Sequence, residues 1–285
     1  AQESRGLGDV YKRQAFEGAQ ITCGQRAAPG SSERVRIDQK TLEPKFKVIG
    51  CDLWSDESGF SKQTKKSGIT GICGSGIIEV IAEMYLAGII TQDGVINGSI
   101  AEKSERIIKE GRTFSYILHD GKQKIHISQN DVRAIQLAKA ALYAGIRLLM
   151  ERLDIESVDR IRLAGAFGNH IEPKFAMILG LIPDCNLKQV SSAGNAAGTG
   201  ARIALLNHES RNEIEEVVRQ VEKVETAVES NFQQHFVNAM AFPNKIDKFP
   251  KLAKEVQLPA ENMNGNIYDI DVPAPKRRRR KKANL

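Results

Sequence analysis

Two glycine-rich segments, residues 159–168 and 191–201, are the parts of this sequence best suited to hold a ligand. The first reads as a short apolar strand that ends in glycines, where the backbone can turn sharply and approach a ligand closely. In the second, glycines open a helix, and a helix N-terminus directs backbone N–H groups toward a bound anion. A strand, a glycine turn and a helix N-terminus together are a common nucleotide-binding arrangement in α/β proteins.

The glycines of these segments have a second explanation that needs no ligand. Neither segment contains the Gly-Lys-Ser/Thr of a Walker loop, and neither matches the dinucleotide glycine fingerprint. A tight strand-to-helix turn, or a helix packed closely on a sheet, requires the same small residues. Both explanations stay open on the residues alone. The candidate nucleotide contacts are Gly165, Ala166, Phe167, Gly168, Gly194, Asn195 and Gly198.

A third glycine motif, residues 71–76, opens an apolar helix that stops at Gly88. Gly74 and Gly76 are expected where helices cross at a hinge, because a side chain there would hold the two sides apart. Ser75 or Gly74 is expected to cap the helix, and Cys73 is expected to be a small buried residue. We therefore assign a hinge or connecting role to Gly71, Gly74, Ser75 and Gly76.

Other candidate side chains are isolated. Glu17 lies among small residues and could orient a metal-bound water or a ribose, but a solvated surface carboxylate is the alternative. His170 follows the first glycine turn and could contact a ligand, or be a surface or capping histidine. No nucleophile–base pair and no set of metal ligands is evident, so the sequence names no catalytic residue and no metal site.

Composition describes a globular protein, with 41% hydrophobic and 27% charged residues in 285. No apolar run approaches the roughly 20 residues needed to span a bilayer, and the N-terminus lacks the apolar core of a secretory signal. The cysteines show no Cys-x-x-Cys spacing, which argues against a zinc site or an iron–sulfur cluster in this chain. Reduced thiols in the cytoplasm are therefore expected. These cysteines are Cys23, Cys51, Cys73 and Cys185.

The net charge of +6 comes from one tail. Residues 276–282 are seven consecutive cations, which leaves −1 for the rest of the chain. Nothing in the body indicates a nucleic-acid surface. The basic run could contact nucleic acid, an acidic membrane or an acidic protein surface weakly, but a solubilising disordered tail is the favoured interpretation, and we expect no membrane association.

Hydrophobic periodicity predicts the order of the elements. Strands are expected at 33–38 and 45–49, a hairpin at 112–119 and 122–128 with Asp-Gly at its turn, and a strand at 160–164. The strongest helix is predicted at 131–153, with a face formed by Val132, Ile135, Ala138, Leu142, Ile146 and Leu149. A charged helix at 209–222 is predicted to bury Ile214, Val217, Val218 and Val221, followed by a strand at 226–228 and a helix capped by Ser230.

Three regions follow from this pattern. Residues 1–14 share no pattern with the rest and are either a non-native leader or a disordered terminus. Residues 15–243 carry the predicted α/β elements. Residues 244–285 lose periodicity and are interpreted as a disordered tail that contains the basic run.

Four ordered motifs resemble the C-terminal part of RACo-type activators, the ATP-dependent reductive activators of corrinoid-dependent methyltransferases. The resemblance extends from about residue 15 to 243, and it identifies an ASKHA-type domain of the acetate kinase, sugar kinase, Hsp70 and actin superfamily. It implies an α/β fold: a ribonuclease-H-like, actin-like ATPase subdomain with a mixed sheet flanked by helices. The motifs are Phe16–Ala19, Gly71–Gly76, Leu163–Gly168 and Gly194–Gly200.

The resemblance assigns roles to these motifs. It implies that two halves close over ATP, that residues 165–168 are the adenosine motif and that residues 71–76 connect the halves. It also implies that ATP, Mg²⁺ and a [2Fe–2S] cluster serve the complete protein. The two phosphate hairpins and the ferredoxin domain that carries the cluster are expected to be missing from this N-terminally truncated sequence.

The implied activity is ATP-dependent restoration of cob(I)alamin in a corrinoid protein of a methyltransferase system. Its partner would be that corrinoid protein, and such activators commonly form homodimers. This chain alone is expected to be inactive, because the phosphate motifs are absent. The alternative is a non-catalytic interaction module that keeps the nucleotide fold and docks through its basic tail.

Overall fold

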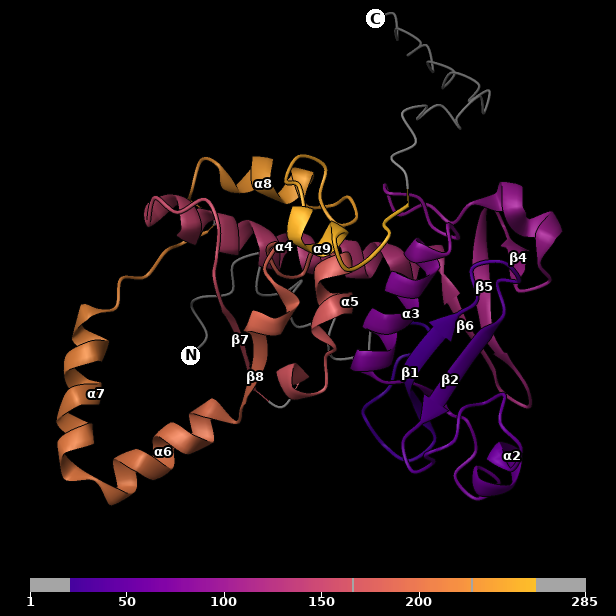
Figure 1. Ribbon diagram of the computed structural model, residues 1–285, viewed down its shortest axis with the longest axis horizontal. Coiled ribbons are helices and arrows are strands. Elements are labelled where there is room, and N and C mark those ends of the chain that lie inside the picture. Colours follow the sequence, from indigo (N-terminus) through magenta and orange to yellow (C-terminus); the bar gives the residue numbers. More distant parts are fainter. Residues whose placement is uncertain (1–20, 166, 227, 260–285) are drawn as a thin grey trace, which may run out of the picture.

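The computed structural model describes residues 21–165, 167–226 and 228–259 as an α/β assembly of two small sheets and an additional parallel strand pair around buried helices (Figure 1). The predictions for residues 1–14, Glu17, Ala166 and the basic run 276–282 fall outside the described residues. The strands are β1 (Ser31–Ile37), β2 (Pro44–Val48), β3 (Gly71–Ile72), β4 (Ile107–Glu110), β5 (Thr113–Asp120), β6 (Lys124–Ser128), β7 (Ile161–Ala164) and β8 (Val190–Gly194). The α-helices are α2 (Phe60–Gln63), α3 (Gly74–Leu86), α4 (Gln129–Arg152), α5 (Pro173–Ile178), α6 (Ala196–Leu206), α7 (His208–Gln220), α8 (Phe232–Asn238) and α9 (Pro250–Ala253).

The first sheet has the order β2-β1-β3. Strands β1 and β2 are antiparallel, whereas the two-residue β3 runs parallel to the start of β1. Val35 and Val48 are fully buried, as their alternation with polar residues predicts. The prediction of this strand pair is confirmed, and β2 begins at Pro44, one residue earlier than predicted.

The second sheet, β4-β5-β6, contains the predicted hairpin. The turn differs from the prediction: Asp120 pairs with Lys124, so the loop is the three residues 121–123. A register shift between Ile117 and His119 accompanies this pairing. Asp-Gly therefore marked the hairpin correctly but not the length of its loop.

Helix α4 begins at a capping box formed by Ser128 and Asp131. The Ser128 side chain accepts from the Asp131 N–H, and the Asp131 carboxylate accepts from the Ser128 N–H. Its first half is buried along Val132 and Ile135, but Leu149 is 50% exposed. The predicted face is therefore wrong at its C-terminal end, where α4 extends beyond the sheets and is covered on one side by α8.

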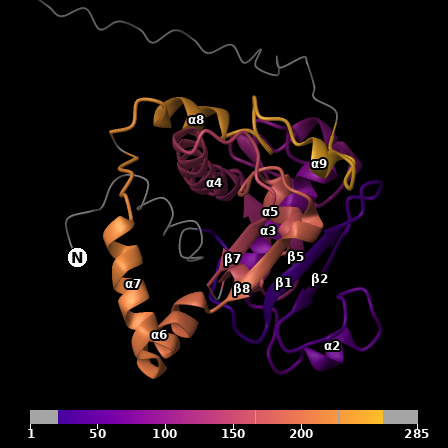
Figure 2. The same cartoon turned by 60° about the vertical axis from the view of Figure 1, so that its left-hand side comes forward.

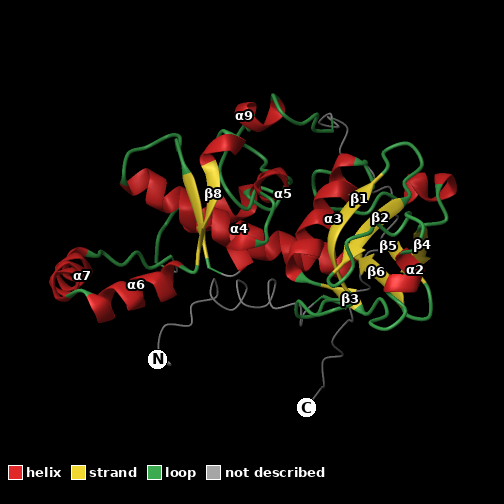
Figure 3. Cartoon of the chain, turned by 60° about the horizontal axis from the view of Figure 1, so that its bottom comes forward, coloured by secondary structure: helices red, strands yellow, loops and turns green. Residues whose placement is uncertain are grey.

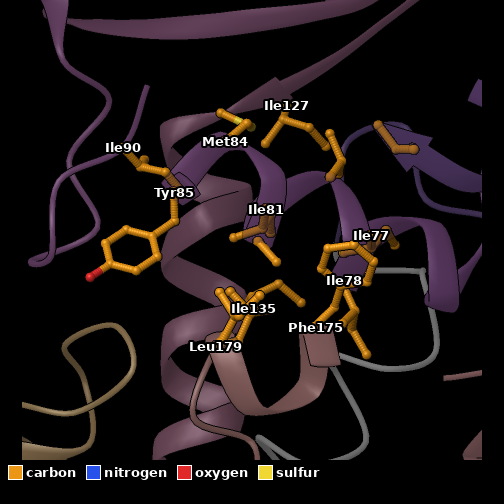
Figure 4. Packing of buried hydrophobic residues seen from close by; sticks show 14 of the residues in the cluster. Ile77, Ile78, Ile81, Met84, Tyr85, Ile90, Ile127, Ile135, Phe175 and Leu179 are labelled. Atoms are coloured by element: carbon orange, nitrogen blue, oxygen red, sulfur yellow. The ribbon is translucent and has the colours of Figure 1, made fainter. Parts of the chain in front are cut away.

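Helix α3 lies at the centre of the core. Nearly every one of its residues is buried, which accords with a sequence that is apolar apart from Ser75, Glu79 and Glu83. Figure 4 shows its side chains between residues of α4, β6 and the α5 segment. The labelled core residues are Ile77, Ile78, Ile81, Met84, Tyr85, Ile90, Ile127, Ile135, Phe175 and Leu179.

Two carboxylates of α3 accept hydrogen bonds from backbone N–H groups at the edge of β1, where the pairing with β3 ends after Ser32. The Val35 N–H donates to Glu79 Oε2 at 2.9 Å, and the Ile37 N–H donates to Glu83 Oε2 at 3.3 Å. Four helical residues rise about 6.0 Å and two strand residues about 6.6 Å, so an i, i+4 pair of carboxylates matches alternate strand N–H groups. The helix thus takes the place of a neighbouring strand.

Strands β7 and β8 form a separate parallel pair, and α5 and α3 lie between this pair and the first sheet (Figure 3). Helices α6 and α7 follow β8 and extend away from the α3–α4 core (Figures 1 and 2). They pack mainly on each other. The predicted burial of the α7 stripe is therefore wrong, because its members are 41–68% exposed: Ile214, Val217, Val218 and Val221.

The residues after α7 also differ from the predictions. Thr226 and Val228 lie in turns and not in a strand. Helix α8 is preceded by Asn231, which makes no side-chain cap, so the capping role predicted for Ser230 is wrong. Sequence periodicity is short here, and no neighbouring strand is available within the described residues to stabilise an extended segment.

Residues 244–258, which the sequence pattern assigns to the tail, pack on the body. Phe249 and Leu252 are buried. Asp184 caps α9 from a distant part of the chain, since its carboxylate accepts from the Lys251 N–H at 2.8 Å and from the Leu252 N–H at 2.9 Å. Two apolar anchors and one cap are too few to produce periodicity, which is why the pattern missed this segment.

The fully buried Lys139 of α4 binds the backbone just before this segment. Its ammonium group donates to the Ala241 carbonyl and, at 2.7 Å, to the Pro243 carbonyl, and it lies 5.0 Å from the Phe242 ring centroid. No carboxylate contacts it among the described residues. Burial therefore lowers the pKa of Lys139 well below its ordinary value.

This lysine is expected to make stability rise with pH. In the unfolded chain, Lys139 keeps its proton up to the ordinary lysine pKa of about 10.4, whereas in the folded chain it loses the proton at lower pH. Between these two pKa values the unfolded chain therefore binds one more proton than the folded chain. The free energy of unfolding of the wild type minus that of Lys139→Met should increase by up to about 1.4 kcal/mol per pH unit in that window. Urea denaturation of both proteins at several pH values measures this difference. A difference that stays flat or falls with pH would contradict the burial argument.

Among the described residues, no helix is long and apolar enough to cross a membrane. Within the same ranges, no three histidine, cysteine or acidic side chains are grouped so that they could hold a metal ion.

Candidate functional site

The two glycine-rich segments meet at the carboxyl ends of β7 and β8. These strands pair in parallel, with Leu163 opposite Ser192 and Ala164 opposite Gly194. The pairing continues into the turns, where the Gly165 N–H donates to the Gly194 carbonyl at 2.8 Å. Ligands of open α/β sheets bind outside the carboxyl ends of parallel strands. The structure therefore brings the two predicted segments together at the edge where a ligand is expected.

Gly165 and Gly194 leave space at this edge. Their φ angles are +97° and +61°, a region that favours glycine. A Cβ atom built on either residue would meet no atom within 4 Å. Close packing therefore does not explain why these two residues are glycines. Their left-handed backbone conformation does favour glycine. The open space fits a backbone that a ligand approaches closely.

Gly168 and Gly198 have structural explanations. A Cβ on Gly168 would lie 3.1 Å from the Leu163 backbone, so the tight turn needs a glycine. A Cβ on Gly198 would lie 2.5 Å from the Asn195 amide nitrogen. Asn195 is the N-cap of α6, and its Oδ1 accepts from the Gly198 N–H at 2.9 Å. These residues shape the site whether or not they touch a ligand.

Side chains also join the two turns. Phe167–Asn169 form a short 3₁₀ helix, and the Ser192 hydroxyl donates to Asn169 Oδ1 at 2.5 Å. The Gly194 N–H donates to the same hydroxyl at 3.0 Å. Ser192 and Asn169 were not singled out from the sequence. The position of Ser192 within the second glycine segment was the only signal available.

The glycines of the 71–76 motif are packed tightly, but against strand backbone and the Phe167 ring and not at a crossing of two helices. A Cβ on Gly71 would lie 2.7 Å from the Cys23 carbonyl oxygen, and one on Gly76 would overlap the Ser32 carbonyl oxygen and lie 2.9 Å from Ile72 Cγ2. A Cβ on Gly74 would overlap the Phe167 ring. The absence of side chains is required at each position.

The predicted cap of α3 is wrong. The N-cap is Cys73, which makes no side-chain cap hydrogen bond, and the helix begins at Gly74. Ser75 lies inside the first turn, buried, with its hydroxyl 3.3 Å from the Cys73 sulfur. Phe167 fills the space beside Gly74, the residue before Ser75, so a side chain at Gly74 would clash with its ring. Cys73 is buried, as predicted.

The contact between Gly74 and Phe167 joins the hinge motif to the first glycine turn. Both residues were candidates from the sequence, but for different roles, and nothing in the sequence indicated that they touch. His170 follows the turn and is exposed. Its backbone carbonyl accepts a hydrogen bond from Arg34 Nη1 at 3.2 Å. This contact does not involve the imidazole ring, so it gives the ring no ligand-binding role.

A charged cluster beside the hinge was missed altogether. Arg34 and Arg36 of β1 each place an Nη1 atom 2.6 Å from a carboxylate oxygen of Glu79, whose side chain is 1% exposed. Arg36 also contacts Glu172, which precedes α5, at 3.0 Å. The available signal was Glu79 and Glu83, two carboxylates in an otherwise apolar helix, since such groups need partners when buried.

The cluster has two electrostatic consequences. Burial raises the pKa of Glu83, although the Ile37 N–H and Arg36 oppose the shift. Burial lowers the pKa of Arg34, but the hydrogen bond and charge of Glu79 outweigh it, so the pKa is raised overall. Arg34 therefore stays a cation wherever the protein is folded.

An open, polar groove of about 520 Å³ lies outside this cluster. Arg34, Arg36 and Lys47 line it together with Trp54 and Glu172. Arg36 and Lys47 place their charges 5.8 Å and 5.3 Å from the Trp54 ring centroid. The groove does not contain the glycine turns, so it is not part of the candidate nucleotide site.

Comparison with known proteins agrees with this arrangement. The structure is an α/β domain of the actin-like ASKHA class. A sequence model of the C-terminal domain of RACo, the ASKHA domain, matches residues 14–253. The chain belongs to this family.

Two relatives carry descriptive names. The chain is similar to the corrinoid activation enzyme RamQ of Eubacterium limosum, with 32% identity over 244 residues, which cover 81% of this chain and 38% of the relative. It is also similar to the solved structure of a reductive activator for a corrinoid, iron–sulfur protein, with a TM-score of 0.67 and 32% identity over 81% of this chain and 35% of that one. The chain thus spans less than two fifths of the length of either protein.

Proposed function

We propose that this chain is the nucleotide-binding C-terminal part of an ATP-dependent reductive activator for a corrinoid protein. The observation that carries the proposal is the pair of glycine turns at the carboxyl ends of β7 and β8, with open space at Gly165 and Gly194. Membership of the RACo C-terminal family and the names of the two relatives support the same assignment.

The residues at this edge fit the adenosine side of a nucleotide. Gly165 and Gly194 present backbone to the open side, and the first turn of α6 adds the N-terminus of an 11-residue helix. Gly168, Asn195 and Gly198 fix the shape of the turns. The resemblance to the family assigns residues 165–168 to the adenosine, and we propose this role for them, with Gly194, Asn195 and Gly198 beside it.

The described residues do not indicate where the activator would hold Mg²⁺ or a [2Fe–2S] cluster. No acidic cluster for Mg²⁺ lies among the described residues, and the described cysteines do not gather around a common point. From the resemblance to the family, we propose that other parts of the complete protein supply the Mg²⁺ and phosphate contacts and the [2Fe–2S] cluster. When bound, Mg²⁺ would neutralise phosphate charge and the cluster would supply an electron.

In the complete protein, ATP binding and hydrolysis would drive a movement between two halves. That movement would allow one electron to pass to cob(II)alamin of the partner, which gives the methyl-accepting cob(I)alamin. This chain would contribute the adenosine pocket, the hinge at residues 71–76 and part of the contact with the corrinoid protein. We assign it to the cytoplasm, with a homodimer as the expected assembly.

A chimera tests the function. Residues 14–253 of this chain would replace the matched region of the corrinoid activation enzyme RamQ. With ATP, a low-potential reductant and a corrinoid protein, the cob(II)alamin absorption should disappear faster than with ADP. The matched controls are the intact relative and the relative with the region deleted. A folded chimera that binds ATP but leaves cob(II)alamin unchanged would contradict the proposed function.

The same experiment tests the alternative of a non-catalytic module that docks through residues 276–282. The chimera lacks this basic run. If the chimera no longer binds the corrinoid protein, the result would favour the module. Binding that persists without it supports the activator.

A further inference from the structure

Two arginines project from β1 in an arrangement that is unfavourable by itself. Arg36 lies directly opposite Lys45 on β2, and Arg34 lies opposite Lys47. Like charges that face each other across a strand pair destabilise a sheet. Acidic partners outside the sheet must therefore hold these side chains.

One such partner fixes the arginines at their base. Glu79 is buried, and its Oε2 atom is held by the Val35 N–H at 2.9 Å. Because Glu79 contacts both guanidinium groups at 2.6 Å, each group is oriented before it reaches any other residue. The arginines are therefore rigid attachment points.

Both arginines also contact the segment that follows the first glycine turn. Arg36 Nη2 is 3.0 Å from Glu172 Oε2, and the Arg36 guanidinium carbon is 4.7 Å from the ring centroid of Phe175. Arg34 Nη1 donates to the His170 carbonyl at 3.2 Å. Both arginines thus join the first sheet to residues 170–175.

The start of this segment is held by packing. Phe167 occupies the space over Gly74, so the segment 167–175 is fixed at an apolar end and at a charged end. We propose that Arg36 and Glu172 are positioning residues that hold the candidate nucleotide turn in register with the hinge motif, with Arg34 as a second attachment. This inference rests on the proposed function for its role in nucleotide binding, whereas the positioning itself does not.

Amide hydrogen exchange tests the positioning directly. In Arg36→Gln and in Glu172→Gln, exchange at residues 167–175 should become about threefold faster, the size expected for a partly exposed ion pair. The double variant should exchange no faster than the singles, because the interaction is lost in each. Arg36→Lys should recover part of the protection. The matched control is Arg106→Gln, which breaks the 2.7 Å pair with Glu43 at similar arginine exposure but far from the turn.

Titration of ADP into the same variants tests the link to nucleotide binding. The dissociation constant should rise about threefold in Arg36→Gln and Glu172→Gln. Glu172→Gln leaves the Arg36–Glu79 pair intact, so its melting midpoint should be like that of Arg106→Gln. Unchanged exchange at residues 167–175, or equal acceleration in Arg106→Gln, would overturn the positioning. Faster exchange in a chain that binds no ADP would support the positioning and contradict the proposed function instead.

Discussion

Replacement of Glu79 by alanine should lower the free energy of unfolding by about 3 kcal/mol, because it leaves the buried Val35 N–H without an acceptor and two arginines without their common partner. Both arginine side chains are about one third exposed and can turn toward water, which limits the loss. In a chain of this size the melting midpoint should fall by roughly 6–12 °C. Thermal unfolding followed by circular dichroism measures the shift.

Two variants calibrate this prediction. Glu79→Gln keeps an oxygen for the Val35 N–H, so it should lose less than the alanine variant. Glu43→Ala removes a carboxylate that pairs with Arg106 and is 55% exposed, and it should cost no more than about 1 kcal/mol. If Glu79→Ala were as mild as Glu43→Ala, the account of α3 as a substitute for a strand would be wrong.

Gly76, the last residue of the 71–76 motif, should be similarly sensitive to substitution, for a steric reason. In an open helix, alanine stabilises by about 0.5–1 kcal/mol relative to glycine. At Gly76 the new methyl group would overlap the Ser32 carbonyl oxygen and lie 2.9 Å from Ile72 Cγ2, and neither can move without shifting β1 or β3. We expect Gly76→Ala to lose about 2–3 kcal/mol in urea denaturation.

Gly145→Ala is the matched control, since this glycine lies inside α4 and a Cβ there would meet nothing within 4 Å. It should gain about 0.5–1 kcal/mol. The two substitutions are chemically identical and should have opposite signs. A stabilising Gly76→Ala would refute the close packing at the hinge.

Local elements with strong patterns could be predicted from the sequence. Helix α4 has an explicit capping box and a long apolar repeat, and β1 and β2 alternate regularly, so propensity and burial agree there. The turn glycines could be found because Gly165 and Gly194 adopt conformations that other residues avoid. The resemblance of four motifs then gave the family, which the comparison confirms.

Long-range contacts could not be predicted in this way. Nothing local marks Glu79 as the partner of β1, Phe167 as the residue over Gly74, or Asp184 as the cap of α9, since each contact joins segments that are distant in sequence. The exposure of the α7 valines is a property of what surrounds the helix, not of its amphipathic pattern. Nucleotide binding by residues 165–168 stays a prediction.

The most direct test of the central claim, that the paired glycine turns bind an adenine nucleotide, is a comparison of ADP binding by Gly194→Asn and Gly88→Asn. Both glycines have left-handed φ angles, +61° and +70°, both leave a Cβ position without neighbours within 4 Å, and asparagine tolerates this conformation. Only Gly194 lies at the proposed site. Saturation-transfer NMR should detect ADP on the wild type and on Gly88→Asn, and at least tenfold weaker binding to Gly194→Asn. Equal binding by the two variants would contradict the proposed site.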